Sequence, residues 1–196
     1  KPSLSTTSIE PEFPSQSNQL ALILGLSQIL FKYNLKSLLI LPLIIGKTHA
    51  SYDFSDFTSL HQAALNRDNN ELSTLIKSGD YELDSQEKHG YTALMFSVEK
   101  RNKRATKLLL DKGAKLNLKN IEGNTALTIA AAHGFEEIVE LLLDAKADVN
   151  LTGSKEWTAL MMASSTDHTG IVKLLLAKRA NLNLKNDEGN TALTIA

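Results

Sequence analysis

Apolar and polar residues follow a helical period in the middle of the chain. Residues 125–134 read TALTIAAAHG, a short run of small apolar side chains that ends in polar residues. Residues 136–143 read EEIVELLL, with apolar positions at i, i+3 and i+4, which is typical of an amphipathic helix. Glu136 and Glu137 suit the positive end of that helix. The pattern therefore predicts a short helix, a turn, a longer helix and a polar loop.

The same pattern recurs at a fixed interval. The phrase Thr-Ala-Leu begins at Thr92, Thr125, Thr158 and Thr191, which are evenly spaced, and a weaker copy begins at Thr58. A constant interval of this length indicates a stacked array of repeats. Each Thr can cap the first helix of its unit, because its hydroxyl can accept from backbone N–H groups in the first turn.

These units resemble the ankyrin repeat, a family with a 33-residue period, two helices per unit and a Thr-Pro-Leu-His type of signature. The signature is fullest at 58–61, which reads TSLH, and the family's Pro is Ala or Ser in every copy. The resemblance covers roughly residues 53–196. It implies an all-α ankyrin-repeat solenoid of paired antiparallel helices with extended hairpin-like loops.

We divide the array, residues 51–196, into four units and the start of a fifth. The units span 53–84, 87–119, 120–152, 153–185 and 186–196. The expected helices span 58–66 and 70–77, 92–100 and 103–111, 125–133 and 136–145, and 158–165 and 169–178. Because the first residue is Lys and residue 196 falls within an expected helix, we interpret the chain as a fragment.

Several turn positions that are Gly in one unit hold a larger residue in another. Gly79 and Gly113 follow the second helix in units one and two, where units three and four have Lys146 and Arg179. The Gly134 position is Arg101 in unit two and Asp167 in unit four, and the Gly123 position is Glu156 in unit four. A left-handed backbone costs a non-Gly residue roughly 1 kcal/mol or more. We therefore expect units two and four to be the less stable ones.

The N-terminal quarter has a different composition. Residues 1–19 hold three of the four prolines and many Ser and Thr with no period, so we expect a disordered or non-native leader. The apolar run at 38–46 follows Lys32 and Lys36, and small residues precede a cleavage point after Ala50. This order is typical of a secretory signal peptide, which we place within residues 20–50.

Two alternatives remain for this segment. One is a membrane anchor formed by residues 20–45, although four polar or charged side chains interrupt the span and each is costly at mid-bilayer. The other is a buried helix that packs on the array. The cleaved signal predicts a mature chain that begins at Ser51, and the anchor predicts membrane contact through residues 20–45.

Composition and motifs give no indication of catalysis. The chain has no cysteine, which excludes disulfides, thiolate zinc sites and a cysteine nucleophile. The net charge of −1 gives no support for nucleic-acid binding. No phosphate-binding loop or nucleophile elbow is present, and no two histidines share a helix face at ligand spacing. We expect no enzyme activity, cofactor, metal or small-molecule substrate, and His61 and His133 should make hydrogen bonds near the turns.

The resemblance implies that a partner binds at the loop tips and at the exposed side of the first helices. The loop-tip candidates are Lys88, His89, Tyr91, Ile121, Glu122, Asn124, Ser154, Lys155 and Trp157. The first-helix candidates are Glu99, Lys100, His133 and Thr166. Tyr91 and Trp157 precede the capping Thr of their units, and Tyr and Trp are frequent interface hot spots. Alternatively, each ring only covers the neighbouring loop.

We therefore expect a non-catalytic protein–protein interaction module, an ankyrin-repeat scaffold that a bacterium exports to the periplasm or the medium. One alternative is a membrane-tethered adaptor. Another is the accessory array of an enzyme whose catalytic domain lies beyond residue 196. The expected partner is a protein.

Overall fold

The computed structural model describes residues 56–79 and 81–196. The expected leader (1–19) and the expected signal peptide or anchor (20–50) lie outside these residues. The described helices are α3 (Ser59–Leu65), α4 (Asn69–Ser78), α5 (Ala93–Glu99), α6 (Lys103–Asp111), α7 (Ala126–Ala132), α8 (Glu136–Asp144), α9 (Ala159–Ser165), α10 (Thr169–Ala177) and α11 (Ala192–Ile195), with a short 3₁₀ turn η2 (Ser154–Glu156). The helices predicted for units one to four are confirmed, and their ends lie close to the expected ones.

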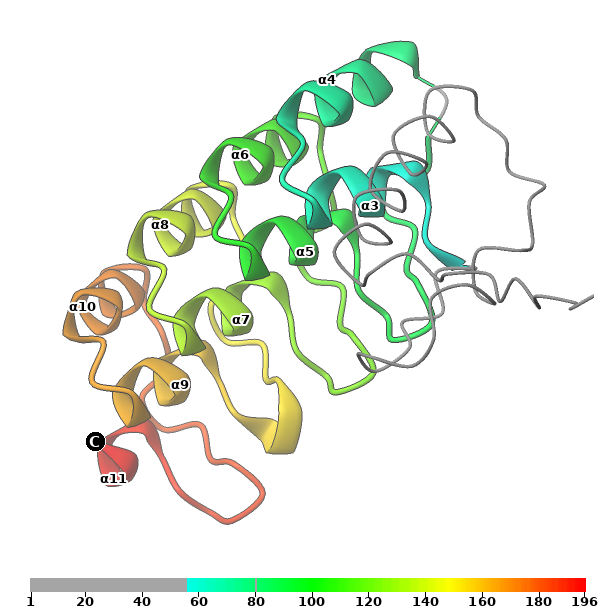
Figure 1. Cartoon of the computed structure of the whole chain (residues 1–196). Helices are drawn as coiled ribbons and strands as arrows, with labels where there is room; N and C mark the ends of the chain where they lie inside the picture. Colours follow the sequence, from blue (N-terminus) through cyan, green and yellow to red (C-terminus); the bar gives the residue numbers. More distant parts are fainter. Residues whose placement is uncertain (1–55, 80) are drawn as a thin grey trace, which may run out of the picture. The chain divides into compact units, whose positions relative to one another are not determined.

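The helices stand in two rows (Figure 1). One row, the first-helix row, consists of α3, α5, α7, α9 and α11, and each member packs on the next. The second-helix row consists of α4, α6, α8 and α10, and each of these packs on the first helix of its own unit. Long loops lead from each second helix to the next first helix. The predicted all-α repeat solenoid is confirmed.

The capping Thr of each complete unit explains where its first helix begins. The hydroxyls of Thr58, Thr92, Thr125 and Thr158 each accept from the backbone N–H at the third position of the helix, at 3.2 to 3.3 Å. This bond satisfies one of the donors that a helix start otherwise leaves unpaired. The phrase that defines the repeat in the sequence is thus also the signal that starts the helix.

The centre of the core consists of small side chains between the two rows and one leucine from each second helix. Leu109, Leu142 and Leu175 have no exposed surface, and they occupy equivalent positions in α6, α8 and α10. Leu72, one turn earlier in α4, is equally buried. Ala64, Ala130 and Ala163 on the first helices are equally buried. Small residues at these positions allow adjacent helices to approach closely. Truncation of such a leucine to Ala typically costs about 2–5 kcal/mol.

The five residues that the sequence placed at a turn Gly position of another unit all have a left-handed backbone. The φ angles are 50° at Arg101, 74° at Lys146, 58° at Glu156, 56° at Asp167 and 65° at Arg179. Arg67 and Lys155, which sequence comparison did not single out, share this conformation. Unit four contains Lys155, Glu156, Asp167 and Arg179, so the largest share of this backbone strain lies there.

Candidate functional site

The loop tips are hairpin-like turns that share one backbone hydrogen-bond pattern. The N–H of the first tip residue donates to the carbonyl of the fifth, and these pairs are Glu87–Tyr91 (3.1 Å), Asn120–Asn124 (3.0 Å), Gly153–Trp157 (2.6 Å) and Asn186–Asn190 (2.9 Å). In three tips the fourth residue is a glycine with φ near +80°, a conformation that L side chains rarely adopt. The backbone of the candidate site is therefore held in place by local hydrogen bonds.

The first side chain of a tip completes the turn in units two and three. The Asn120 Oδ1 atom accepts from the Asn124 N–H at 2.8 Å, and the Glu87 Oε1 atom accepts from the Tyr91 N–H at 3.0 Å. Unit four has Gly153 at this position, so its tip lacks such an acceptor. There the Asn124 Oδ1 atom of the preceding unit accepts from the Ser154 N–H at 3.3 Å. The shape of the fourth tip therefore depends on its neighbour.

Backbone hydrogen bonds also join some tips to each other. The Ile121 N–H donates to the His89 carbonyl at 2.9 Å, and the Asp187 N–H donates to the Lys155 carbonyl at 3.3 Å. With the bond from Ser154 to Asn124, these contacts connect the tips of units two to five into one row. The structure thus brings all nine loop-tip candidates onto one continuous surface, the tip row.

The two aromatic candidates rest on the first helices of their own units. The Tyr91 ring stacks on Phe96, with ring centroids 5.1 Å apart and an interplanar angle of 26°. Trp157 occupies the same position relative to Met162, and both are half-buried. An apolar residue before the cap that contacts the fourth helical residue is a hydrophobic staple, which fixes how the chain enters the helix. Each ring therefore has a structural role and still offers an exposed edge.

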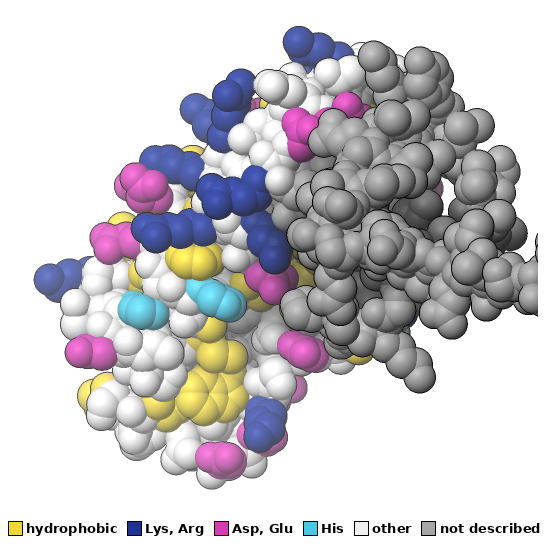
Figure 2. Space-filling model, in the orientation of Figure 1, with side chains coloured by type: hydrophobic (Ala, Val, Ile, Leu, Met, Phe, Trp, Pro, Cys, Tyr) yellow, Lys and Arg dark blue, Asp and Glu magenta, His cyan; other side chains and the backbone are white. Residues whose placement is uncertain are grey.

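A shallow groove of about 270 Å³ lies beside the Trp157 ring. Its lining residues are Ser154, Lys155, Trp157, Met162 and Glu188. Three of these were candidates from the sequence, whereas Met162 and Glu188 were missed. Figure 2 shows hydrophobic side chains gathered on the surface in the region of α9. We call this site the Trp157 groove.

The signal for Met162 was present in the sequence. Met162 is the fourth residue after the capping Thr158, the same spacing that separates Phe96 from Thr92. The fourth helical residue packs against the residue before the cap, so an aromatic at 157 predicts that position 162 lies beside it. Glu188 had no comparable signal, because it enters the groove from the next tip along the row.

The four first-helix candidates lie elsewhere. Glu99, Lys100, His133 and Thr166 are all exposed, at the ends of α5, α7 and α9 where the chain turns toward the second helix. The His133 Nδ1 atom donates to the Ile129 carbonyl at 2.9 Å, and the Thr166 hydroxyl donates to the Met162 carbonyl at 2.8 Å. Both polar groups therefore close the ends of their own helices, and none of the four lines the groove.

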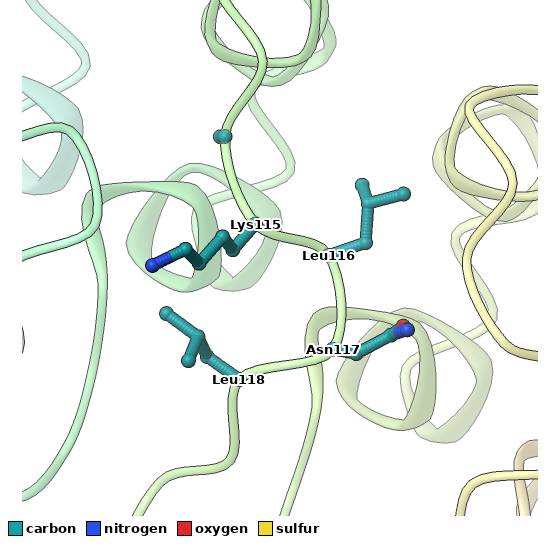
Figure 3. Close-up of a pocket in the computed structure, with 5 residues that line it drawn as sticks. Lys115, Leu116, Asn117 and Leu118 are labelled. Atoms are coloured by element: carbon teal, nitrogen blue, oxygen red, sulfur yellow. The ribbon is translucent and has the colours of Figure 1, made fainter.

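A second hollow, of about 410 Å³, lies along the loop after α6 (Figure 3). It is lined by the consecutive residues 114–118, with Lys115 and Leu118 on one side of the chain and Leu116 and Asn117 on the other. The polar groups here connect neighbouring units. The Lys115 N–H donates to Asp84 Oδ1 at 2.7 Å, and the Asp148 N–H donates to Asn117 Oδ1 at 3.1 Å. We assign this hollow a structural role.

The histidine of unit one has a structural role. His61 is 1% exposed, its Nδ1 atom accepts from the Thr58 N–H at 3.2 Å, and its Nε2 atom donates to the Ser85 carbonyl at 2.8 Å. Burial lowers the pKa of His61, which outweighs the opposing effects of the Ser85 bond and the Glu87 charge. The neutral ring therefore acts as a fixed hydrogen-bonding bridge between helix and loop.

Within residues 56–79 and 81–196, no three His, Cys, Asp or Glu side chains are grouped as metal ligands would be. In the same part of the chain, every helix is too short or too polar to cross a bilayer.

Two rows of stacked helices joined by a row of loop tips make this protein a helical repeat solenoid. Comparison with protein families identifies the repeat. Residues 60–153 match a model described as ankyrin repeats (3 copies), and residues 142–196 match a model described as ankyrin repeats (many copies). The chain belongs to the ankyrin-repeat family, whose members generally act as protein–protein interaction modules and are typically non-catalytic. Comparison with curated proteins gives no match.

Proposed function

We propose that this array is a non-catalytic scaffold that binds a protein partner along the tip row, with the Trp157 groove at the centre of the contact. The observation that carries this proposal is the convergence of Trp157 and Met162 in one groove between the charges of Lys155 and Glu188. An apolar floor with a polar rim is the usual anatomy of an interface anchor site. The groove suits an apolar side chain of the partner, flanked by polar or charged neighbours.

An internal duplication supports a binding role for Ile121 as well. Residues 116–130 and 182–196 are identical except at one position, where the first has Ile121 and the second has Asp187. The backbone N–H of each of these residues donates to a carbonyl of the preceding tip, at His89 and Lys155 respectively. The Ile121 side chain is 70% exposed. Because Asp187 forms the same loop, the fold does not require an isoleucine at this tip.

Peptide selection would test the proposal. A displayed random peptide library is selected against the chain, and the selected peptides are titrated while tryptophan emission is recorded. Trp157 is the only tryptophan, so its emission reports on the groove alone. We expect a shift in that emission on binding. We also expect Trp157→Ala to weaken binding by about tenfold or more in calorimetric titrations, as loss of a hot spot does.

Ile121→Asp is the sharper variant, because the chain itself carries Asp in the equivalent loop. We expect it to weaken binding several-fold with no change in stability. Leu182→Ala is the control, since Leu182 is 50% exposed but lies outside the groove. Peptides that bind the Trp157→Ala and Ile121→Asp variants as tightly as the unchanged chain would show that the partner surface lies elsewhere.

We propose further that residues 20–50 direct export and are removed before Ser51. The support is the order of charges, apolar run and small residues in the sequence. The intact mass and N-terminal sequence of the expressed protein, measured in each cell fraction, test this proposal. A membrane-bound species that retains residues 38–45 would instead establish the tethered adaptor.

A further inference from the structure

The exposed faces of α6 and α8 carry opposite charges at equivalent positions. Lys103, Arg104 and Lys107 of α6 correspond, one repeat later, to Glu136, Glu137 and Glu140 of α8. All six side chains are exposed. The reversal of charge extends to the whole units. Residues 87–119 contain nine Lys or Arg and three Asp or Glu, whereas residues 120–152 contain one Lys or Arg and six Asp or Glu. A basic ridge therefore lies directly beside an acidic ridge.

The two ridges neutralise each other only in part. One ion pair joins them within the chain, between Lys103 Nζ and Glu137 Oε1 at 3.2 Å. Both of its side chains are more than half exposed, so solvent screens the pair strongly. Among the described residues, Arg104, Lys107, Glu136 and Glu140 form no ion pair. Two cations and two anions thus remain available on adjacent helices of the second-helix row, where Figure 2 shows Lys and Arg side chains clustered with acidic side chains beside them.

We propose that this surface binds a second copy of the chain. A two-fold axis parallel to α6 and α8, lying in the plane of contact, places α6 of each copy against α8 of its partner. Every attraction then occurs twice, as an isologous interface requires. A nucleic acid or an anionic membrane would be attracted by α6 but repelled by α8. The second copy is the one occupant whose charges on this surface are known to be complementary.

The geometry predicts a weak and salt-sensitive association. Contact is limited to two helices of each copy, and the surfaces are charged, so the interface falls in the small, transient class. The Debye length shortens from about 30 Å at 0.01 M salt to about 3 Å at 1 M, which should weaken the association at least about tenfold. The pairing uses the second-helix row and leaves the Trp157 groove of each copy free. The dimer would therefore be a bivalent scaffold, whose avidity for a partner with two sites exceeds that of one copy.

Charge reversal in two separate variants tests the pairing. In the first variant Lys103, Arg104 and Lys107 are all changed to Glu, and in the second Glu136, Glu137 and Glu140 are all changed to Lys. Each variant carries two like-charged ridges, so each alone should be monomeric in sedimentation equilibrium at about 0.01 M salt, where the unchanged chain self-associates. An equimolar mixture of the two should form a heterodimer, because the ridges are then complementary again.

The control changes Lys77, Lys119 and Lys185 to Glu, which alters the net charge as the first variant does but leaves both ridges intact. It should self-associate like the unchanged chain, and circular dichroism would confirm that every variant is folded. Three results would each overturn the proposal: an unchanged chain that stays monomeric at low salt, a mixture that does not associate, or a control that is equally disrupted. None of these measurements involves the tip-row partner, so they stand apart from the test of the proposed function.

Discussion

Two stretches of this chain have almost the same sequence but different surroundings. Residues 116–130 lead into α7, and residues 182–196 lead into α11. Their local hydrogen bonds agree closely: the first Asn of each tip accepts at 2.8 Å from the fifth residue, and the capping Thr donates its N–H at 2.8 Å to the Thr at the third position of the helix. Their burial does not agree. Leu127 is 2% exposed, whereas Leu193 is 79% exposed.

The difference in burial shows which structural features depend on a repeat's own sequence and which depend on the neighbouring repeats. Turn, cap and helix start depend on residues close in sequence, so they are the same in both stretches. Burial of the apolar face depends on the next helix of the row, as expected for a solenoid in which each repeat contacts only its neighbours. The two stretches are therefore matched sites, at which the same substitution separates local effects from effects of the neighbouring repeat.

Leu127→Ala and Leu193→Ala should differ most. Removing a buried leucine typically costs about 2–5 kcal/mol, and removing an exposed one costs about 0.5 kcal/mol or less. We expect the first variant to lose about 3 kcal/mol of unfolding free energy in urea and the second to be nearly unchanged. Equal losses would mean that Leu193 is buried in solution, through contacts that the described residues do not provide.

Asn120→Ala and Asn186→Ala should instead have equal local effects. Both side chains are 5% exposed, and each Oδ1 atom accepts from the N–H that closes its tip. Loss of a buried acceptor leaves that donor unpaired, at a cost of about 1–3 kcal/mol. Amide hydrogen exchange at Asn124 and Asn190 would measure the effect. A much smaller acceleration at one of the two sites would contradict the view that the tips are locally determined.

Gly123→Ala and Gly189→Ala should have the same cost in backbone strain but different costs in steric contact. The φ angles are 84° and 82°, so each alanine should lose about 1 kcal/mol from its left-handed backbone. A Cβ atom at Gly123 would also lie 3.3 Å from the Gly153 carbonyl carbon, whereas one at Gly189 would meet nothing within 4 Å. Thermal unfolding should therefore show the larger loss for Gly123→Ala. The reverse change, Glu156→Gly, should stabilise unit four by roughly as much as Gly189→Ala destabilises its tip.

The smallest expected effect is a pH dependence confined to unit one. His61 occupies the helix position of Thr128, and its Nδ1 atom accepts from the Thr58 N–H as the Thr128 hydroxyl accepts from the Thr125 N–H. Burial lowers the pKa of His61 below its ordinary value of 6.5, so the unfolded chain binds the proton more readily. Stability should be fully present above about pH 6.5 and fall as the pH drops below it.

Hydrogen exchange in α3 and α7 across this pH range would test the last prediction. Exchange in α3 should accelerate at low pH beyond the change seen in α7, where the equivalent residue does not titrate. His61→Gln should remove that excess. An excess that persists in this variant would assign the pH dependence to another group.

The helices were predictable from the sequence because their determinants are local. A capping Thr, an apolar period and a polar loop recur in each unit, and each is readable without knowledge of the fold. The left-handed positions were predictable for the same reason, since alignment of the units places Arg101, Lys146 and Arg179 at Gly positions.

The candidate site was predictable only in part. The tips were found because the family resemblance assigns them a binding role. The groove was not, because Glu188 reaches it from the neighbouring unit and no pattern within one unit shows such a contact. The first-helix candidates at the ends of α5, α7 and α9 do not line the groove, and their role in partner binding stays a prediction. His133 bonds to its own helix, as the sequence predicted, and Thr166 does the same. Side-chain direction, which single-sequence patterns do not supply, decides which residues line the groove.

The duplication also has a consequence for how such an array can change over generations. The two near-identical stretches, 116–130 and 182–196, are separated by an interval of two whole units. The sequence that connects unit four to unit five is therefore nearly identical to the sequence that connects unit two to unit three. Recombination between the copies would insert or delete a pair of units and recreate a junction that already folds. Array length can thus vary in steps of two, while single substitutions such as Ile121 against Asp187 alter the surface of individual tips.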